Sequence, residues 1–161
     1  MGQNQIDKLD EKTLTLIAEN ARMPFLEVAR ECNVSGAAIH QRIQKLQSIG
    51  VIKGSEFIMD ATKIGYNTCA YMGIFLKDAN MYKSVTEELH RIPEVVECHY
   101  TTGKYAMFIK IYAKNNKDFL RIIHKKLQPI EGISSTETII SLSEGFRRQV
   151  PIIGSGDENK N

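Results

Sequence analysis

Side chains that could pair with nucleic acid are concentrated in one short stretch of this sequence, residues 35–48. Gln41 and Gln44 carry amides that can pair with base edges, and Arg42 and Lys45 can reach phosphate or guanine. The stretch also contains small or polar residues that permit close approach to a partner: Ser35, Gly36, Ala37 and His40. The chemistry predicted for this stretch is recognition of double-stranded DNA.

Local charge supports this prediction, whereas total charge does not. With 21 basic and 19 acidic residues among 161, the formal net charge of +2 is too small to indicate a nucleic-acid binder. No acidic residue occurs between Glu31 and Glu56, however, so a surface built from this stretch would not repel phosphate. A helical hairpin that only packs a core remains the alternative.

A second group of polar residues could bind a small molecule. Hydroxyls, backbone N–H groups and one carboxylate can together orient a zwitterion such as an amino acid. The candidate residues lie in two segments of the chain: Tyr100, Thr101, Thr102, Gly103, Lys104 and Tyr105, and then Thr136, Glu137 and Thr138. Ordinary hairpin and edge-strand chemistry is the alternative explanation for both segments.

The histidines and cysteines show no metal-ligand spacing. His90, His99 and His124 are scattered, and Cys98 and His99 alternate across a predicted strand, so they point to opposite faces. Three cysteines without a CxxC pair predict neither a disulfide framework nor a zinc site. No catalytic triad, paired carboxylate motif or phosphate-binding glycine loop stands out, so neither enzyme activity nor a cofactor is expected.

The same features predict a cytoplasmic protein. Unpaired cysteines suit a reducing compartment. No apolar run approaches the roughly 20 residues needed to span a bilayer. The N-terminal residues lack the apolar segment of a signal peptide.

Three helices are expected to position the first group of residues. Asp10 can cap a helix in which Leu14, Ile17, Ala18 and Ala21 share a face. A second helix is expected to begin at Pro24, which suits a first helical position, and to end at Asn33, which tolerates a left-handed conformation. Ser35 caps the third, which ends at Gly50. The predicted core of this unit consists of Val28, Ala29, Ile39, Ile43 and Leu46. The acids Asp7, Asp10 and Glu11 are expected to lie away from DNA.

The second half of the chain predicts a β-α-β-β-α-β order, which makes a ferredoxin-like α+β sandwich. The strands are expected from Ala70 to Leu76, Val95 to Tyr100, Tyr105 to Tyr112 and Ile133 to Leu142. One helix carries Tyr82, Val85, Leu89 and Ile92, and the other Phe119, Leu120, Ile123 and Leu127. Both helices cover one sheet face, so a second copy of the chain is the natural cover for the other.

Three segments follow from these patterns. Residues 1–60 are the predicted helix-turn-helix domain, with short extended pieces at Val51–Ile52 and Phe57–Met59 as a linking strand. Residues 61–153 are the predicted ligand-binding and oligomerisation domain. The glycine-rich polar residues 154–161 are expected to be disordered.

Taken in order, the motifs LDEKTLTLI, EVARECNVSGAAIHQRIQKLQSIGVIKG, EVVECHYTTGKYAMFIKI and GISSTETIISL resemble the Lrp/AsnC family of leucine- and asparagine-responsive regulators. The turn Gly103-Lys104-Tyr105-Ala106 lacks the acids that many members carry there, which resembles the asparagine-responsive branch. The resemblance implies a transcription regulator that dimerises, assembles to an octamer of four dimers, and binds an amino acid such as asparagine between dimers.

The prediction is therefore a cytoplasmic, sequence-specific DNA-binding regulator that responds to an amino acid. One alternative is an amino-acid-sensing module whose helical half binds protein rather than DNA. Steep salt dependence of duplex binding would distinguish the two. The other alternative, a small metabolic enzyme on a ferredoxin-like fold, lacks an acid-base constellation.

Overall fold

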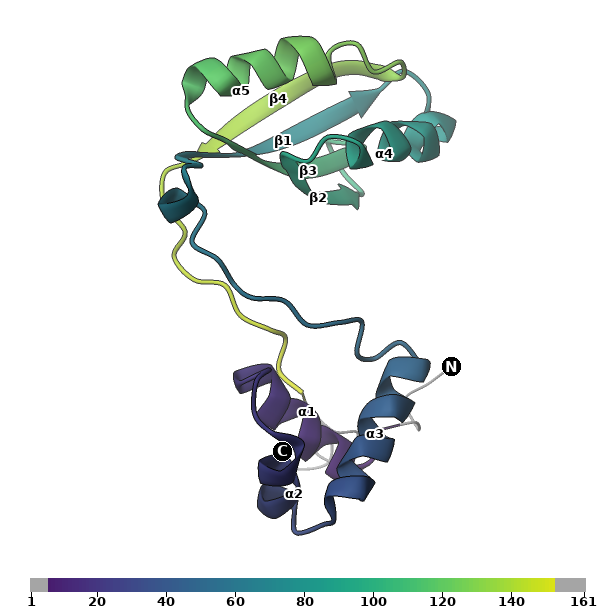
Figure 1. The fold of residues 1–161 in the computed structure, drawn as a ribbon. Helices are drawn as coiled ribbons and strands as arrows, with labels where there is room; N and C mark the ends of the chain where they lie inside the picture. Colours follow the sequence, from purple (N-terminus) through teal and green to yellow (C-terminus); the bar gives the residue numbers. More distant parts are fainter. Residues whose placement is uncertain (1–5, 153–161) are drawn as a thin grey trace, which may run out of the picture. The chain divides into compact units, whose positions relative to one another are not determined.

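The computed structural model describes residues 6–152, which divide into two compact units. The first unit comprises the described residues up to Phe57 together with those from Arg147 onward, and the second runs from Ile58 to Phe146 (Figure 1). Residues 154–161, predicted to be disordered, lie outside the described residues. Within residues 6–152, no helix combines the length and apolar character that crossing a bilayer requires.

The first unit contains three helices: α1 Lys8–Glu19, α2 Phe25–Cys32 and α3 Gly36–Ser48. Asp7, and not Asp10 as the sequence suggested, is the N-cap of α1. The Asp7 carboxylate accepts from the Asp10 N–H at 2.8 Å, and the Asp10 carboxylate accepts from the Asp7 N–H at 3.1 Å. This reciprocal capping box starts the helix three residues earlier, because each acid satisfies a backbone donor of the other.

The core of this unit is the predicted one on α2 and α3. Val28, Ala29, Ile39, Ile43 and Leu46 are all buried. On α1, Leu14 is buried and Ile17 is packed against the core, but the prediction was wrong for the two alanines. Ala18 is exposed, and Ala21 lies beyond the helix end in a turn. The buried side of α1 instead includes the polar Asp10 and Thr13.

Residues 51–60 form neither helix nor strand, so the predicted linking strand makes no ladder within this chain. The backbone N–H groups of Val51 and Ile52 both donate to the Leu46 carbonyl, at 2.9 and 3.0 Å. Gly50, at φ 75°, makes this reversal possible. The start of the segment thus closes the end of α3, and its backbone donors are no longer available for a ladder.

The second unit has the predicted β-α-β-β-α-β order (Figure 1). Its main elements are β1 Thr68–Leu76, α4 Tyr82–His90, β2 Val95–Tyr100, β3 Met107–Ala113, α5 Asn116–Ile122 and β4 Ile133–Ser141. Three short helical turns complete it: η2 Thr62–Ile64, η3 Ala79–Met81 and η4 Ile123–Leu127. The sheet order is β2-β3-β1-β4 with every neighbouring pair antiparallel, so β1 and β3 are central. This is the ferredoxin-like arrangement.

Both helices pack on one face of the sheet. The buried cluster combines alternate residues of the central strands with Val85 and Leu89 of α4 and with Phe119 and Ile122 of α5. Leu120, predicted to be buried, is 54% exposed. The reason is that α5 continues through η4 as a wider π-helical turn, so Leu127 shares the buried side with Ile122.

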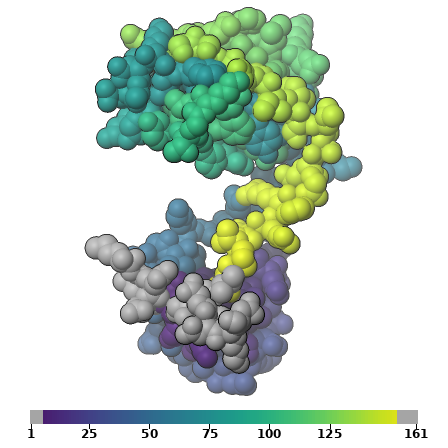
Figure 2. All heavy atoms as spheres, turned by 180° about the vertical axis from the view of Figure 1, so that it is seen from behind, coloured from purple at the N-terminus to yellow at the C-terminus, as the bar shows by residue number. Residues whose placement is uncertain are grey.

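The opposite sheet face carries large side chains that this chain does not fully cover. Tyr71 of β1 stacks on Phe108 of β3 with ring centroids 5.8 Å apart, and Ile139 of β4 is 53% exposed. Large apolar residues also stand exposed on the segment that follows β4, among them Leu142 and Phe146. This segment is drawn in yellow in Figure 2. Exposed apolar surface of this kind indicates an interaction site.

Candidate nucleic-acid interface and ligand site

Two residues set the turn between α2 and α3. Asn33 ends α2 in the left-handed conformation, at φ 54°, as predicted. Ser35 then caps α3, since its hydroxyl oxygen accepts from the Ala38 N–H at 3.1 Å. A Cβ added to Gly36 would lie 3.0 Å from Cδ2 of Leu26, so glycine here lets α2 and α3 approach closely. The two helices of the predicted helix-turn-helix, α2 and α3, are thus closely packed.

The outward face of α3 carries no acidic side chain. The exposed residues of this helix are Ala37, His40, Gln41, Gln44, Lys45, Gln47 and Ser48. The His40 ring lies 6.0 Å from the Phe25 ring of α2, and its Nε2 lies 3.3 Å from Nε2 of Gln44. Phe25 therefore supports a histidine that lies beside one of the predicted base-reading amides.

Arg42 and Lys45, the two predicted DNA-contacting cations, both bind acids at the start of α1. Arg42 Nη1 donates to Asp10 at 3.0 Å and also contacts Asp7, and Lys45 Nζ donates to Asp10 at 2.9 Å. Arg42 is partly buried on the flank of α3 that meets α1, whereas Lys45 binds the same acid but remains exposed, one helical turn after Gln41. Two of the three acids expected to lie away from DNA therefore contact the recognition helix.

These contacts determine the charge state of the cluster. Burial would raise the pKa of Asp10, but hydrogen bonds from Lys45, the Asp7 N–H and Arg42 hold it below its ordinary value. The pKa of Asp7 is lowered chiefly by its hydrogen bond from Arg42, and the pKa of Arg42 is raised by both acids. Asp7, Asp10 and Arg42 are therefore all ionised at neutral pH.

Sequence reasoning missed Phe25 and the two acids of this cluster. The Asp-x-x-Asp spacing of Asp7 and Asp10 is a recognisable capping-box signal. No sequence signal pairs Asp10 with Arg42 and Lys45, which lie 32 and 35 residues away.

The predicted ligand turn contacts β4 within the same chain. Lys104 Nζ and the Tyr105 hydroxyl each donate to Oε2 of Glu137 at 2.7 Å. The turn is held by Gly103 at φ 95° and by the Thr101 hydroxyl, which donates to the Tyr105 carbonyl at 2.8 Å. The pKa of Glu137 is lowered, first by the hydrogen bond from Lys104 and then by that from Tyr105.

Gly73 explains how this contact crosses the sheet. Strand β1 lies between β3 and β4, and Gly73 pairs with Glu137 of β4. The Tyr105 ring lies against Gly73, where a Cβ would stand only 2.4 Å from the ring carbon Cδ1. Because glycine leaves that space open, Tyr105 reaches across β1 to Glu137. The ring also packs edge-on against Phe75 at 5.4 Å.

Not all predicted ligand residues gather here. Thr136 and Thr138 pair with Ile74 and Met72, so they lie on the helix-covered face, opposite to Glu137. Tyr100 lies on that face too and stacks on Tyr82 of α4 with ring centroids 4.6 Å apart. The structure therefore brings together Lys104, Tyr105 and Glu137 and separates them from Thr136, Thr138 and Tyr100.

Lys110 lies at the centre of the open sheet face. Its side chain is only 8% exposed, with Glu97 at 3.6 Å and Glu144 at 3.8 Å. Burial would lower the pKa of Lys110, but the neighbouring Tyr112, Tyr71 and Glu97 raise it to about 12. A charged lysine is thus built into an otherwise aromatic surface.

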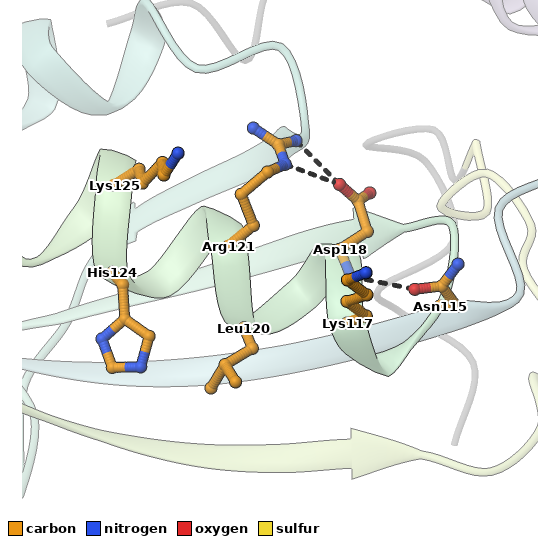
Figure 3. Close-up of a pocket in the computed structure, with 7 residues that line it drawn as sticks. All are labelled: Asn115, Lys117, Asp118, Leu120, Arg121, His124 and Lys125. Carbon is orange, nitrogen blue, oxygen red and sulfur yellow. Dashed lines mark hydrogen bonds and ion pairs between the residues drawn. The ribbon is translucent and has the colours of Figure 1, made fainter.

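A shallow hollow lies along α5 and η4 (Figure 3). Its lining comes from this one helical segment: Asn115, Lys117, Asp118, Leu120, Arg121, His124 and Lys125. Arg121 turns toward Asp118 and donates to it through Nη2 at 2.7 Å. None of the predicted ligand residues lines this hollow. Across the part of the chain that the structure describes, no three His, Cys, Asp or Glu side chains could together hold a metal ion.

Both units match known families. Residues 69–151 match the Lrp/AsnC ligand binding domain, and residues 6–53 match a winged helix-turn-helix DNA-binding family.

Similar proteins cover nearly the whole chain. The regulatory protein AsnC of Haemophilus influenzae is 39% identical over 147 residues, which is 91% of this chain and 98% of that protein. A solved structure of Escherichia coli AsnC, 35% identical, matches with a TM-score of 0.84 over 91% of this chain and 98% of that one. A transcriptional regulator from Neisseria meningitidis, solved as an L-Met complex, shares the fold, with a TM-score of 0.82 over 89% of this chain and 94% of that one at 18% identity.

The curated relatives are named as regulatory proteins and transcriptional regulators, which agrees with the expectation that this chain is not an enzyme. This chain carries a helix-turn-helix unit followed by a ferredoxin-like unit. Both domain matches and both AsnC relatives lead to the same conclusion. The chain belongs to the Lrp/AsnC family and is a DNA-binding transcription regulator of the AsnC type.

Proposed function

We propose that the effector of this regulator is a small polar amino acid, and that asparagine binds better than leucine. The observation that carries the proposal is the contact of Glu137 with Lys104 and Tyr105, at 2.7 Å each. It places an ammonium, a hydroxyl and a carboxylate together at the open end of a turn. A zwitterion needs a donor for its carboxylate and an acceptor for its ammonium, and these groups supply both. The match to the Lrp/AsnC ligand binding domain and the neighbour solved with L-Met support an amino-acid ligand.

The polar character of the turn favours an amide side chain over an aliphatic one. Thr102 is exposed and offers a hydroxyl, and Gly103 offers a backbone N–H beside it. Polar groups that are desolvated without a partner cost free energy, so a site of this composition discriminates against an apolar analogue. Leucine would leave these groups unpaired.

Calorimetry with asparagine, glutamine and leucine tests the proposal on the wild type and on Lys104→Gln and Glu137→Gln. Glu88→Gln is the matched control, because Glu88 is also paired, to Arg91, and its side chain is 48% exposed against 46% for Glu137. We expect asparagine to bind tightest and both site variants to weaken it, with Glu88→Gln unchanged. Leucine binding tightest, or asparagine binding unaffected by Glu137→Gln, would refute the proposal.

For DNA, we propose that α3 enters the major groove and that its outward amides read the sequence. Ser35, Gly36 and Ala37 at the start of α3 allow close approach to phosphate, since the first backbone N–H groups of a helix attract anions. Salt-dependent binding of duplexes by the full chain tests this, and binding of a protein partner without duplex binding would favour the protein-binding alternative.

We further propose that the chain works in the cytoplasm as a homodimer that assembles to an octamer. In this proposal residues 1–60 contact DNA, and residues 61–153 bind the effector and form the dimer. The incompletely covered aromatic and apolar face of the sheet supports the dimer, since a second copy would cover it. Light scattering at micromolar concentration measures the assembly.

A further inference from the structure

The carboxylate of Asp10 is buried beneath two cations of the recognition helix. Its side chain has no exposed surface. It accepts from Arg42 Nη1 at 3.0 Å, from Lys45 Nζ at 2.9 Å and from the Asp7 N–H at 3.1 Å. Asp7 adds a second carboxylate beside Arg42. The acceptors of Asp10 are thus directed at α3 and at the start of α1 rather than at solvent.

This arrangement removes positive charge from the recognition surface. Two carboxylates face two cations on the flank between α1 and α3, so this flank has no net charge. The side chains of Arg42 and Lys45 are 28% and 43% exposed, so both still reach the surface of the unit. Lys45 is the only Lys or Arg among the exposed residues of α3, and it is bound to Asp10.

We propose that Asp10 is a specificity-determining residue of this regulator. By holding Arg42 and Lys45 against α1, it withholds two cations from DNA phosphates and so limits sequence-independent binding. Affinity then depends more strongly on neutral groups that pair with base edges, such as Gln41 and Gln44. Asp10 acts through the two cations without touching DNA, so it is a positioning residue.

Asp10 competes with a DNA phosphate for Arg42 and Lys45, and the burial of Asp10 favours Asp10. A phosphate at the protein surface is hydrated and screened by salt, and an exposed ion pair contributes little. Asp10 is buried, so losing its partners would leave an uncompensated charge in the protein interior, which is costly. The cations therefore remain with Asp10 when a duplex approaches.

Asp10→Asn tests the proposal, because asparagine keeps the side-chain shape but removes the charge. Glu11→Gln is the matched control, since it removes one negative charge at the next position of α1, and among the described residues Glu11 makes no ion pair with α3. Each full-length variant is titrated over a range of salt concentrations. Two duplexes are used: one that the wild-type chain enriches from a random pool, and a scrambled version of it.

We expect Asp10→Asn to tighten binding to the scrambled duplex by about two- to fivefold for each released cation. The slope of log affinity against log salt should steepen by up to about 0.9 for each cation. The ratio of matched to scrambled affinity should fall, and Glu11→Gln should change all three quantities less. An unchanged salt slope in folded Asp10→Asn would overturn the proposal.

Lys45→Gln tests whether Lys45 contacts phosphate, even if Asp10→Asn folds poorly. In the wild-type background a withheld Lys45 adds little to the salt slope, so Lys45→Gln should leave the slope unchanged. In the Asp10→Asn background it should remove part of the added slope. If Lys45→Gln alone flattens the slope by about 0.9, Lys45 already contacts phosphate and the proposal is wrong. Circular dichroism establishes that each variant is folded.

Discussion

The absence of a side chain at Gly73 determines where the Tyr105 ring lies. A methyl group there would stand 2.4 to 2.5 Å from the ring carbons, well inside contact distance. The ring would have to move, and its hydroxyl would leave Glu137, to which it now donates at 2.7 Å. A glycine in a central strand, which usually weakens a sheet, thus serves the proposed effector site.

We therefore predict that Gly73→Ala weakens asparagine binding by about tenfold, on the order of 1.4 kcal/mol, because the charge-assisted hydrogen bond is lost. Calorimetry measures the affinity, and Gly145→Ala is the control, since a Cβ there meets nothing within 4 Å. In a Tyr105→Ala background, where no ring remains to be displaced, Gly73→Ala should have little further effect. Equal losses in both backgrounds would show that Gly73 acts by another route.

Gln41 and Gln44 are exposed on the outward face of α3. We expect Gln41→Ala and Gln44→Ala to relax sequence preference, since base-edge contacts specify sequence, with a loss of about 1–3 kcal/mol on the matched duplex. Fluorescence anisotropy with matched and scrambled duplexes measures this. Equal loss on both duplexes would show that these amides do not read the sequence.

At the scale of elements, the capping box of α1 also joins α1 to α3. Asp7 and Asp10 satisfy each other's backbone N–H groups, and the same two carboxylates bind the flank of α3. The start of one helix and the orientation of another therefore depend on the same charges. Protonation of Asp10 would weaken both.

This coupling predicts an acid-dependent stability. The pKa of Asp10 lies below its ordinary value of 3.8 in the folded chain, so its charge stabilises the fold above that pH, and the stabilisation is lost as pH falls through the lower folded value. We expect Asp10→Asn to lower the free energy of unfolding by about 1–3 kcal/mol at neutral pH. The difference from wild type should shrink below about pH 4. Urea unfolding monitored by circular dichroism from pH 7 to pH 2 measures it. A difference independent of pH would show that packing, and not charge, is responsible.

At the scale of the whole molecule, the open sheet face is the surface proposed to join two chains. It carries Tyr71, Phe108 and Ile139, with the charged Lys110 at its centre. The acids beside Lys110, Glu97 and Glu144, compensate its charge within the same chain. A second copy could therefore cover this face without burying an unpaired charge.

We predict that Ile139→Glu converts the dimer to a monomer, because it places a negative charge on this face. Leu120→Glu is the matched control, since Leu120 on α5 is 54% exposed and Ile139 is 53% exposed. Light scattering on both variants and on the wild type measures the mass. Dissociation by Leu120→Glu but not by Ile139→Glu would place the interface on the helical side.

The sequence by itself determined the local elements of this protein. Asn33 and Ser35 act on backbone groups within a few residues of themselves, so the turn and the start of α3 could be predicted from the local sequence. The stripe of Ile39, Ile43 and Leu46 needs only the helical repeat. The alternation in β1 likewise indicated a central strand, with apolar residues on both faces.

Only the tertiary structure decided which polar groups meet. Asp10 finds Arg42 and Lys45 more than thirty residues away, and Tyr105 reaches Glu137 across Gly73. The cations predicted to contact DNA are therefore also paired with acids at the start of α1, and the ligand residues are divided between two sheet faces. Capping and periodicity act over a few residues, whereas these pairings depend on how helices and strands pack, which no local pattern encodes.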